Sequence, residues 1–489
     1  MNSKNKFDVV IIGSGIGGLV CGCYLAKHGL NVLIVERQTS PGGYCSSFKR
    51  DGFTFDVGVH YLGSCGDGRM LRKVFDELEL SNSLKFNRIN PSDVIIFPDF
   101  EVPIRNDCFE TADKLCQVFP QEKSNIVSFF ETINEKNFLK IYSEFRNQTF
   151  KEMLDRYFKK DELKSFFQVL LGNVGLPSSK VAAITAIVMY RQFVFDGGYY
   201  PTGSMQAIPN ALVSRFKSYG GTILFSATAT SLKVKNKKVT GVVINKEEIV
   251  HSKYVVSNSD AKSLFEIIEN KETAPNRLRE KLNTLKTSIS AFIVYLGVKS
   301  ISCSHKSSVW FFNTYDVDKV YLKAYEGIFD PADDYCICTF PSFHDDTLAP
   351  SGYDSMSIII AAPSENKTKE FIWSKEKETV TEILIGRVKR NLLPNLNEIK
   401  IKIAATPSTL ERYTLNNGGA LYGWASTLDQ IDAGIVPQKT FFENLYMAGH
   451  WVTPGLGQGG VTGVAFSGRS AAKRILLLEK KQNLELVRN

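Results

Sequence analysis

Few folds accommodate a glycine-rich turn set between a short apolar strand and an apolar helix, as this chain has near its N-terminus. Residues 8–12 (DVVII) have the composition of a buried strand, and the turn Gly13-Ser-Gly-Ile-Gly-Gly18 follows at once. An apolar-periodic stretch over 19–28 predicts a helix, and a second strand, 31–35, ends on Glu36. This order of strand, turn, helix, strand and acid within about 30 residues predicts a dinucleotide-binding unit of the Rossmann type.

Each glycine of the turn has a separate physical role in such a unit. Gly13 permits the tight turn, Gly15 lets a pyrophosphate approach the backbone, and Gly18 lets helix and strand pack closely. The phosphates are expected at the helix N-terminus, where unpaired N–H groups and the helix dipole favour an anion. Glu36 falls where a carboxylate can accept hydrogen bonds from a ribose. The unit alone does not distinguish NAD from FAD.

The residues that follow narrow the cofactor through a resemblance. Glu36-Arg37 is followed by Pro41-Gly-Gly-Tyr44 and then by 53–60 (FTFDVGVH). This arrangement resembles the flavoprotein superfamily of amine oxidases, protoporphyrinogen oxidases and phytoene desaturases, in which an acid–Arg–x4–Gly-Gly segment wraps FAD. Paired glycines allow the backbone to press against the cofactor, although a surface turn would also use Pro-Gly-Gly. The resemblance implies FAD.

A second block, in the middle of the chain, is expected to return to the same sheet. Strands over 230–234 and 239–245 would form a hairpin, and a further strand, 254–257, runs into Asn258. In the resembled group, backbone near Ala229 would meet the adenine. A plain β-meander is the alternative for this block.

A third block lies near the C-terminus. A strand over 444–448, the residues 449–454 and a glycine-rich turn, 455–460, lead into an apolar helix over 461–478. The N-terminus of that helix favours the negative charge that a reduced flavin carries. The resembled group usually has Gly-Asp or Gly-Glu where this chain has Gly449-His450. A histidine would donate a hydrogen bond where a carboxylate accepts one, or pair with phosphate if charged.

The segment 197–207 (GGYYPTGSMQA) points to one branch of the superfamily. It resembles the G-G-x-x-Y-P-x-G-G motif of phytoene desaturases, carotenoid cis–trans isomerases and retinol saturases. The runs 255–260 (VVSNSD) and 464–468 (VAFSG) resemble other motifs of these enzymes. Ser204 departs from the usual second glycine, and the loop 454–460 is longer than in the plant-type isomerases.

The motifs and the resemblance together give a set of candidate site residues. The expected cofactor-binding residues are Gly13, Gly15, Ile16, Gly17, Gly18, Glu36, Arg37, Gly42, Gly43, Tyr44, Gly58, Val59, His60, Ala229, Asn258, Gly449, His450, Gly460, Val461 and Thr462. The candidates for catalysis, which lie in or beside these motifs, are His60, Arg191, Tyr200 and Trp451. A structural role stays open for each of the four.

The expected fold class is α/β, with a Rossmann-type FAD-binding domain of the amine-oxidase-like flavoprotein kind and an inserted α+β substrate-binding domain. The FAD-binding domain would be discontinuous, built from 1–66, 196–260 and 408–489. The substrate-binding domain would take 67–195 and 261–407. No second G-x-G-x-x-G follows a strand in the sequence, which argues against a pyridine-nucleotide-dependent disulfide reductase.

Composition excludes several other classes of function. The net charge of +8 is modest and its lysines are spread throughout, so nucleic-acid binding is not expected. The nine cysteines are scattered without metal-ligand or redox spacing, so no metal site is expected. No apolar run of transmembrane length and no signal peptide is expected. The expected location is cytoplasmic, with peripheral contact to an anionic membrane face left open.

The resemblance implies a long apolar polyene or isoprenoid substrate, similar to carotenoids or retinoids. The reaction would be hydride transfer at flavin N5, giving desaturation, saturation or redox-neutral double-bond isomerisation. Such chemistry needs few titratable groups, because the cofactor performs the difficult step. Two alternatives stay open on the same fold: a flavin amine oxidase acting on a smaller substrate, and a non-catalytic prenyl-binding or lipid-binding module.

Overall fold

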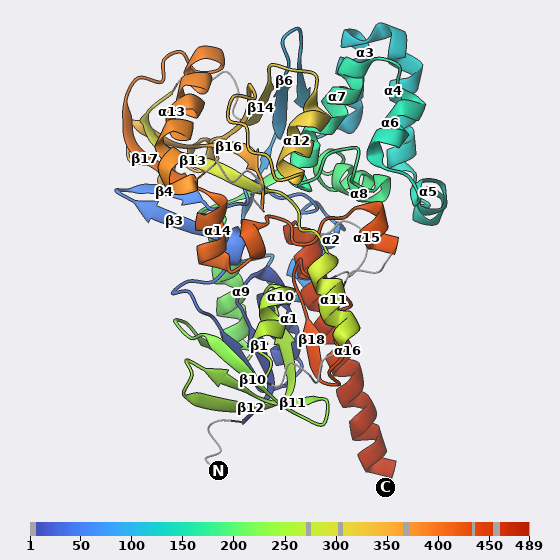
Figure 1. Cartoon of the computed structure of the whole chain (residues 1–489), viewed down its shortest axis with the longest axis vertical. Coiled ribbons are helices and arrows are strands. Elements are labelled where there is room, and N and C mark those ends of the chain that lie inside the picture. The colour runs from blue at the N-terminus through green and yellow to red at the C-terminus, as the bar shows by residue number, and fades with distance from the viewer. Residues whose placement is uncertain are drawn as a thin grey trace.

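The structure, a computed structural model, describes residues 6–269, 275–301, 307–364, 372–432, 436–452 and 460–488. Two β-sheets lie one above the other along the long axis of the molecule, with helices around each (Figure 1). In that view the sheet of the N-terminal strand is the lower one, and both chain termini lie at its end.

The first sheet is built from three distant parts of the chain. Its strands, in sheet order, are β10 (Ala229–Lys235), β11 (Lys238–Ile244), β12 (Glu248–Ser257), β1 (Lys6–Ile12), β2 (Val32–Val35) and β9 (Thr222–Leu224), and β18 (Leu445–Met447) pairs with β12. Strands β18, β12, β1, β2 and β9 run parallel, whereas β10 and β11 form an antiparallel hairpin. The long strand β12 pairs with β11 through its first half and with β18 through its last residues.

The side chains of β1 alternate between two hydrophobic cores. Val9 and Ile11 pack with helices on one face of the sheet, and Val10 and Ile12 pack on the other. The four residues of β2 are all buried. Strands that are covered on both faces read as continuous apolar runs, which explains why 8–12 lacks a polar alternation.

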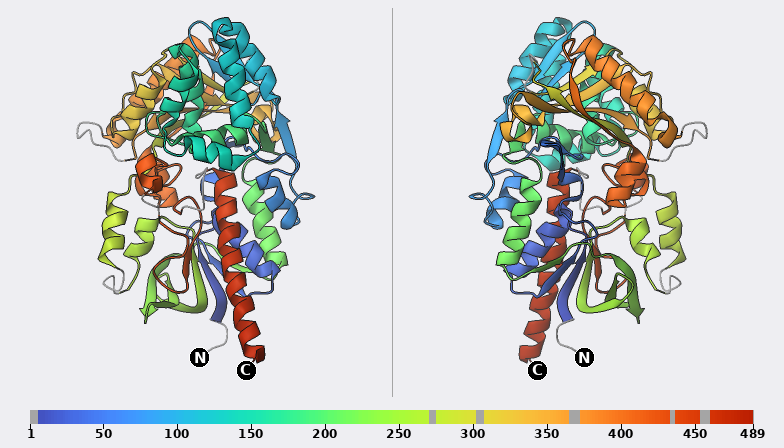
Figure 2. Two further views of the ribbon diagram at one scale, coloured as in Figure 1. Left: turned by 90° about the vertical axis from the view of Figure 1, so that its right-hand side faces the viewer. Right: turned by 90° about the vertical axis from the view of Figure 1, so that its left-hand side faces the viewer.

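Helices cover both faces of the first sheet (Figure 2). One face carries α1 (Ile16–Lys27), α2 (Met70–Glu77), α9 (Ala207–Ser218) and α16 (Val461–Arg488), and the other carries α10 (Ala261–Glu266) and α11 (Asn276–Thr284). Helix α16 crosses α1 closely, because a Cβ atom on Gly468 would lie only 2.1 Å from the carbonyl oxygen of Gly17. This contact fixes the N-terminal part of α16 beside the glycine-rich turn.

The second sheet is largely antiparallel. Its strands, in sheet order, are β17 (Ile399–Ala405), β13 (Ser290–Lys299), β16 (Tyr353–Ala362), β15 (Tyr335–Thr339), β14 (Ser308–Phe312), β6 (Asp93–Ile96) and β7 (Glu101–Ile104). Helices associated with this sheet are α3 (Cys108–Val118), α4 (Lys123–Asn134), α5 (Phe138–Phe145), α6 (Phe150–Tyr157), α7 (Asp161–Val169), α8 (Ala183–Phe193), α12 (Val317–Tyr325) and α13 (Trp373–Asn391). Helix α14 (Pro407–Thr414) and α15 (Leu428–Asp432) lie between the two sheets (Figure 1).

Two small antiparallel strand pairs connect the two parts, the first of them a hairpin. Strands β3 (Ser47–Arg50) and β4 (Phe53–Asp56) form one pair, and β5 (Phe86–Ile89) and β8 (Gly198–Pro201) form the other. The apolar ring of Phe53 packs on the second sheet at Gly297, where a Cβ atom would lie 2.8 Å from the ring. Strand β4 therefore carries the segment that follows it into the space between the sheets.

Within the motif 53–60, strand β4 ends at Asp56, and the residues after it form a bend and extended chain. The helix expected over 461–478 continues to Arg488. The glycine-rich residues 455–459 lie outside the described part of the chain.

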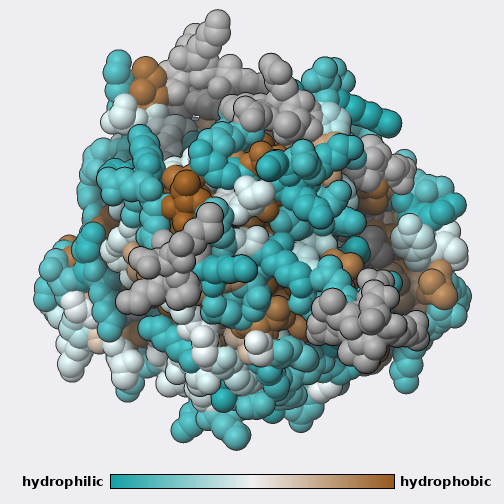
Figure 3. Space-filling view, turned by 90° about the horizontal axis from the view of Figure 1, so that it is seen from below, coloured by the Kyte–Doolittle hydropathy of each residue, from teal (hydrophilic) through white to brown (hydrophobic). Residues whose placement is uncertain are grey.

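The surface seen from below in Figure 3 is mostly hydrophilic, with small hydrophobic areas separated by polar residues. Over the described ranges, no helix is both long and apolar enough to cross a membrane.

Candidate active site

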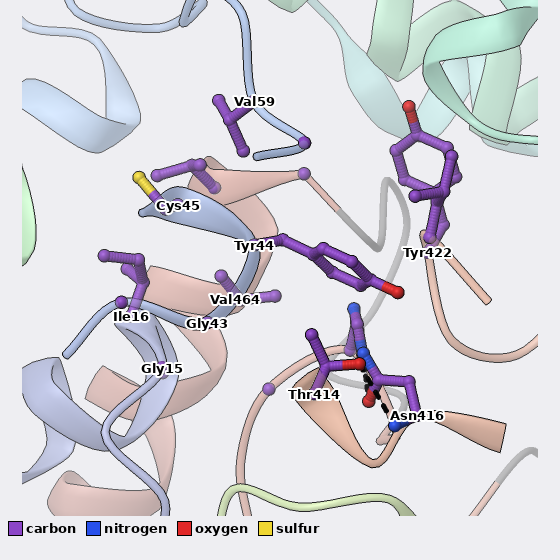
Figure 4. Close-up of a pocket in the computed structure, with 18 of the residues that line it drawn as sticks. Gly15, Ile16, Gly43, Tyr44, Cys45, Val59, Thr414, Asn416, Tyr422 and Val464 are labelled. Atoms are coloured by element: carbon purple, nitrogen blue, oxygen red, sulfur yellow. Dashed lines mark hydrogen bonds between the residues drawn. The ribbon is translucent and has the colours of Figure 1, made fainter. Parts of the chain in front are cut away.

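A cavity of about 350 Å³ lies between the two sheets and is lined by segments of both. Its lower wall comes from the glycine-rich turn, the residues after β2 and the start of α16, and its upper wall comes from one face of the second sheet. Figure 4 shows the lower part, where Gly15, Gly43 and Tyr44 lie near Val464 of α16.

The glycine-rich turn encloses the side chain of Asn258. A Cβ atom on Gly15 would lie 2.7 Å from Asn258 Nδ2, and one on Gly17 would lie 2.6 Å from Asn258 Oδ1. Gly13 has a φ of +94°, which favours glycine. A Cβ atom on Gly18 would lie 2.2 Å from the carbonyl oxygen of Gly13, so Gly18 serves the packing of helix on turn and does not line the cavity.

Helix α1 begins at the cavity without a competing partner for its first amides. Its N-cap residue, Gly15, has no side chain that could cap these amides, and the first turn contains no acidic residue. The first N–H groups of a helix have no carbonyl partner within the helix, and the dipole is positive there. The N-terminus of α1 can therefore bind an anion such as a pyrophosphate.

Glu36 and Arg37, at the edge of the cavity, are each fixed by hydrogen bonds to a different segment. Glu36 Oε2 accepts hydrogen bonds from the Ser14 amide at 2.7 Å and the Ser14 hydroxyl at 2.8 Å. The Arg37 guanidinium donates to the carbonyl oxygens of Arg412 and Tyr413 at 2.7 and 2.9 Å. The acid is thus tied to the glycine-rich turn, and the arginine joins the end of α14 to the end of β2.

Gly42 and Gly43 bring the next segment back to the turn. The Gly42 amide donates to the Ser14 carbonyl at 3.0 Å, and Gly42 and Gly43 have φ values of +123° and +59°. Tyr44 then extends across the cavity toward Thr414 and Asn416 (Figure 4). Burial raises the pKa of the Tyr44 hydroxyl to about 12, so this group is neutral.

His60 lies on the cavity wall in the segment that follows β4. Its Nδ1 atom is buried and has no hydrogen-bond partner among the described residues. Burial lowers the pKa of the ring to about 4, so His60 is uncharged at neutral pH. A neutral imidazole with a free nitrogen can donate to or accept from a ligand in the cavity.

His450 also lines the cavity, but its neighbour Trp451 does not. Asn416 Oδ1 accepts a hydrogen bond from Trp451 Nε1 at 2.8 Å and lies 3.3 Å from His450 Nε2. Trp451 is buried against the ring of Trp424, at 4.9 Å between ring centroids. Trp451 is therefore a packing residue that positions Asn416, and the structure does not bring it to the site as the sequence predicted.

Tyr200 and Arg191, two further candidates for catalysis, also point away from the cavity. Tyr200 is buried and donates a 2.6 Å hydrogen bond to Asp56 at the end of β4. Arg191 donates to the carbonyl oxygens of Ile133, at 2.6 Å, and Glu135, and so caps the end of α4. The helical period of α8 turns Gln192 and Phe193 toward the cavity instead of Arg191.

The structure brings most of the sequence-predicted residues together on the cavity wall. These are Gly13, Gly15, Ile16, Gly17, Glu36, Arg37, Gly42, Gly43, Tyr44, Gly58, Val59, His60, Ala229, Asn258, Gly449, His450, Gly460, Val461 and Thr462.

Sequence reasoning missed the opposite wall. Apolar residues of the second sheet, Ala291, Ile293, Ile337 and Ile359, share one face and line the cavity. Aromatic and polar residues complete the wall: Tyr61, Asn173, Trp310, Thr339, Asn416 and Tyr422. Their strands and loops have ordinary core composition, and only the Gly418-Gly419 turn after Asn416 gave a local signal.

Known proteins resemble this chain over nearly its whole length. Residues 11–78 match the family model of the NAD(P)-binding Rossmann-like domain. Prolycopene isomerase 1, chloroplastic, from an Oncidium hybrid cultivar is 26% identical over 519 residues, covering 98% of this chain and 86% of the relative. The 4,4'-diaponeurosporene oxygenase of Staphylococcus aureus strain MW2 is 23% identical, covering 97% of this chain and 99% of the relative.

Solved structures share the fold. An oxidoreductase from Methanosarcina mazei superposes with a TM-score of 0.72 at 18% identity, covering 96% of this chain and 100% of that one. Putrescine oxidase bound to putrescine gives a TM-score of 0.64 at 14% identity, covering 96% and 99%. The resemblance expected from the sequence is confirmed. The expected α/β fold class is confirmed with it, and the expectation of an enzyme is supported, since these relatives and neighbours are an isomerase, an oxygenase and oxidoreductases. The Rossmann-like match and the structural neighbours support a flavin or nucleotide cofactor.

Proposed function

We propose that this protein is an FAD-dependent enzyme acting on a long apolar polyene of the carotenoid or retinoid kind. The observation that carries the proposal is that one cavity is lined both by the dinucleotide-type motifs and by an apolar sheet face. The two relatives named above, a prolycopene isomerase and a diaponeurosporene oxygenase, support a carotenoid as substrate.

The residues around the glycine-rich turn fit FAD. Asn258 Oδ1 and His60 Nδ1 are buried without a hydrogen-bond partner within the described residues, and both side chains belong to the cavity wall. In our proposal the amides of α1 hold the pyrophosphate, Glu36 holds the ribose, and the N-terminus of α16 faces the flavin ring. FAD would supply hydride transfer at N5, for desaturation, saturation or redox-neutral isomerisation.

The protein's own contribution would be orientation and exclusion of water. The side chains of Ala291, Ile293 and Ile359 offer no hydrogen bonds, so a hydrocarbon chain can replace water against them without loss. His60 is neutral at physiological pH and has a ring nitrogen free to bond the cofactor, whereas the Tyr44 hydroxyl donates to the Gly419 carbonyl oxygen at 3.0 Å and could only accept from a ligand. We also propose the domain division at 1–66, 196–260 and 408–489 against 67–195 and 261–407, which assigns one sheet to each ligand.

The test is reconstitution with FAD followed by turnover under anaerobic conditions. Purified protein should show flavin absorbance, and prereduced or oxidised enzyme should convert a carotenoid mixture into isomers, saturated products or desaturated products. Protein that cannot be reconstituted with FAD would overturn the cofactor assignment. Protein that binds FAD and converts no polyene in either redox state would overturn the substrate assignment.

A flavin amine oxidase is the second candidate. It is favoured by the structural likeness to putrescine oxidase and by the two tyrosines, Tyr44 and Tyr422, that line the cavity. Hydrogen peroxide release with added amines, together with no response to polyenes, would select this function.

Peripheral membrane contact is proposed at α5. Leu139 on this helix is 77% exposed, Tyr142 is 37% exposed, and the neighbouring Lys136 and Lys140 are exposed, with Lys140 ion-paired to Glu135 at 3.1 Å. An apolar side chain flanked by lysines suits an anionic lipid surface. Flotation with anionic liposomes should recover the wild-type protein and lose Leu139→Asp, whereas equal recovery of both would exclude this contact.

A further inference from the structure

Asp93, the first residue of β6, is a fully buried carboxylate that accepts three hydrogen bonds. Tyr61 Oη and Ser92 Oγ each donate to Oδ2 at 2.8 Å, and Trp310 Nε1 donates to Oδ1 at 2.7 Å. No lysine, arginine or histidine of the described residues forms an ion pair with Asp93. A buried carboxylate is costly unless it is well hydrogen-bonded, so its presence without a cation needs an explanation.

Two of the three donors are rings of the cavity wall. Tyr61 and Trp310 line the cavity, whereas Asp93 itself does not. Gly172 makes room for the indole, because a Cβ atom there would lie 2.8 Å from the Trp310 ring. The Tyr61 ring is fixed edge-on to Phe193, with 5.4 Å between ring centroids. The carboxylate therefore lies one hydrogen bond behind a rigid aromatic wall.

The protonation states leave Asp93 with an electrostatic role. Burial raises the pKa of Asp93 to about 6, opposed by its three donors, so it is an anion at neutral pH. Burial and the Asp93 charge raise the pKa of Tyr61 well above its ordinary value, so the phenol keeps its proton. Neither group is suited to transfer a proton to a ligand, since one is shielded and the other is a very weak acid.

We propose that Asp93, acting through Tyr61 and Trp310, makes this part of the cavity stabilise positive charge on a long apolar ligand. The proposal deepens the proposed function and rests on it. An ammonium group with N–H donors would need acceptor oxygens in the cavity, and the oxygens of Asp93 are already used behind the wall. A delocalised carbocation or a quaternary ammonium has no such donors and needs only Coulomb attraction and aromatic contact.

The polyene chemistry produces such a charge. When a C–H bond of a polyene breaks and both electrons leave with the hydrogen to a hydride acceptor, the polyene is oxidised and keeps one delocalised positive charge. Return of the hydride after bond rotation completes a redox-neutral isomerisation, which needs no proton acceptor in the cavity. A fixed negative charge behind the wall favours the cationic stage without any reorganisation.

The experiment compares two ligands of equal shape on the FAD-loaded protein. One is a polyene that ends in a trimethylammonium group, and the other is its carbon isostere, which ends in a tert-butyl group. Wild-type protein should bind the cation about tenfold more tightly than the isostere, the order expected for a desolvated cation at an aromatic wall. Asp93→Asn should bring the ratio of the two dissociation constants to about one and leave binding of the isostere unchanged.

Asp56→Asn is the matched control. Asp56 is equally buried, and burial likewise raises its pKa to about 6, but its donors are Ser47, Tyr200 and the Met205 amide, none of which lines the cavity. This variant should keep the tenfold ratio. Equal binding of the two ligands by wild-type protein would overturn the inference and leave the proposed function standing, whereas failure to bind either would count against the proposed polyene cavity.

A measurement on the Asp56→Asn protein, which lacks the other buried carboxyl with a pKa of about 6, decides the question if Asp93→Asn does not fold. The ratio should fall toward one as the pH falls from 8 to 5, because Asp93 takes up a proton while the quaternary probe stays charged. The titratable groups facing the cluster do not change in this range. His60 and His450 stay neutral because burial lowers the pKa of each ring to about 4, and burial raises the pKa of Tyr422. A ratio that stays constant from pH 8 to 5 would overturn the inference.

Discussion

The Asn258 side chain occupies the space that a side chain on Gly17 would need, with Oδ1 2.6 Å from the position of a Cβ atom. The backbone nitrogen of Gly449 lies 2.9 Å from the same position. Three segments distant in sequence therefore meet at one glycine: the turn after β1, the residue after β12 and the second residue after β18.

Replacing this glycine should disturb all three segments. We expect Gly17→Ala to lower the free energy of unfolding by about 1–3 kcal/mol, the usual cost of overpacking, and to abolish stoichiometric FAD binding. Thermal denaturation and flavin absorbance of the purified variant measure the two effects. Gly386→Ala, in the interior of α13, is the control: its Cβ would meet nothing closer than 3.9 Å, and it should raise stability by about 0.5–1 kcal/mol. A Gly17→Ala protein as stable and as yellow as wild type would contradict the packing argument.

The carboxylate of Glu36 gives a prediction about affinity. Its oxygens accept from the amides of Ser14 and Gln38, each at 2.7 Å, and the side chain lies on the cavity wall. Glu36→Gln presents an NH₂ group to these donors and removes a charged acceptor, so the Kd for FAD should rise about 10-fold to 100-fold. Fluorescence titration of FAD with apoprotein measures this constant, with Glu398→Gln, an exposed position, as the control. An unchanged constant would remove Glu36 from the cofactor site.

The first sheet could be predicted from the sequence because its signals are local. The run 8–12, the glycines after it and Glu36 follow one another within one unit, and the structure places them as expected. The Asn258 segment could be located because it resembles a family motif. The opposite wall of the cavity could not be predicted, because Ile293 and Ile359 come from antiparallel partners far apart in sequence and read as ordinary core.

Two of the four catalytic candidates lie off the cavity for a related reason, whereas His60 lies on its wall. Trp451 and Tyr200 lie one step along the chain from cavity residues or cofactor motifs, but their side chains point into the core and bond to Asn416 and Asp56. Closeness in sequence to a motif does not determine the direction of a side chain, since successive residues of a strand face opposite sides. Asn416 reaches the cavity through its fold partners, since its side-chain oxygen is shared by Trp451 and His450.

Arg191 is predicted to act on stability and not on chemistry. Its guanidinium bonds to the carbonyl oxygens of Ile133 and Glu135, which would otherwise lack partners beyond the end of α4. Arg191→Met should lower the free energy of unfolding by about 1–3 kcal/mol, while turnover per bound flavin stays unchanged. Chemical denaturation and steady-state kinetics test the two parts. Arg191→Lys keeps the charge and can make one of the two hydrogen bonds. Its free energy of unfolding should lie between those of wild type and Arg191→Met. A large loss of turnover in a fully stable Arg191→Met protein would show a direct role in the reaction.

Buried histidines predict how stability depends on pH. Burial lowers the pKa of His344, which packs beside the ring of Tyr200, to about 4, against about 6.5 for an unfolded chain. Below pH 6.5 the unfolded chain therefore binds a proton that the folded chain does not. The contribution of His344 to stability is present above pH 6.5 and is lost as the pH falls toward 4. The buried carboxyls Asp56 and Asp93, whose pKa values are raised, change stability with pH in the opposite direction. The pH dependence of wild-type stability alone therefore does not separate the contribution of His344.

The variant His344→Phe isolates it, because the carboxyl contributions cancel when wild type and variant are compared at each pH. The difference in unfolding free energy between the two proteins should change by about 2–3 kcal/mol between pH 7.5 and pH 4.5, with the variant losing less stability on acidification. Denaturant titrations at the two pH values measure this difference. His251→Phe, at an exposed position, should follow wild type at both. Equal loss of stability by His344→Phe and wild type on acidification would contradict the prediction. It would mean that the His344 ring takes up a proton in the folded protein as readily as in the unfolded chain.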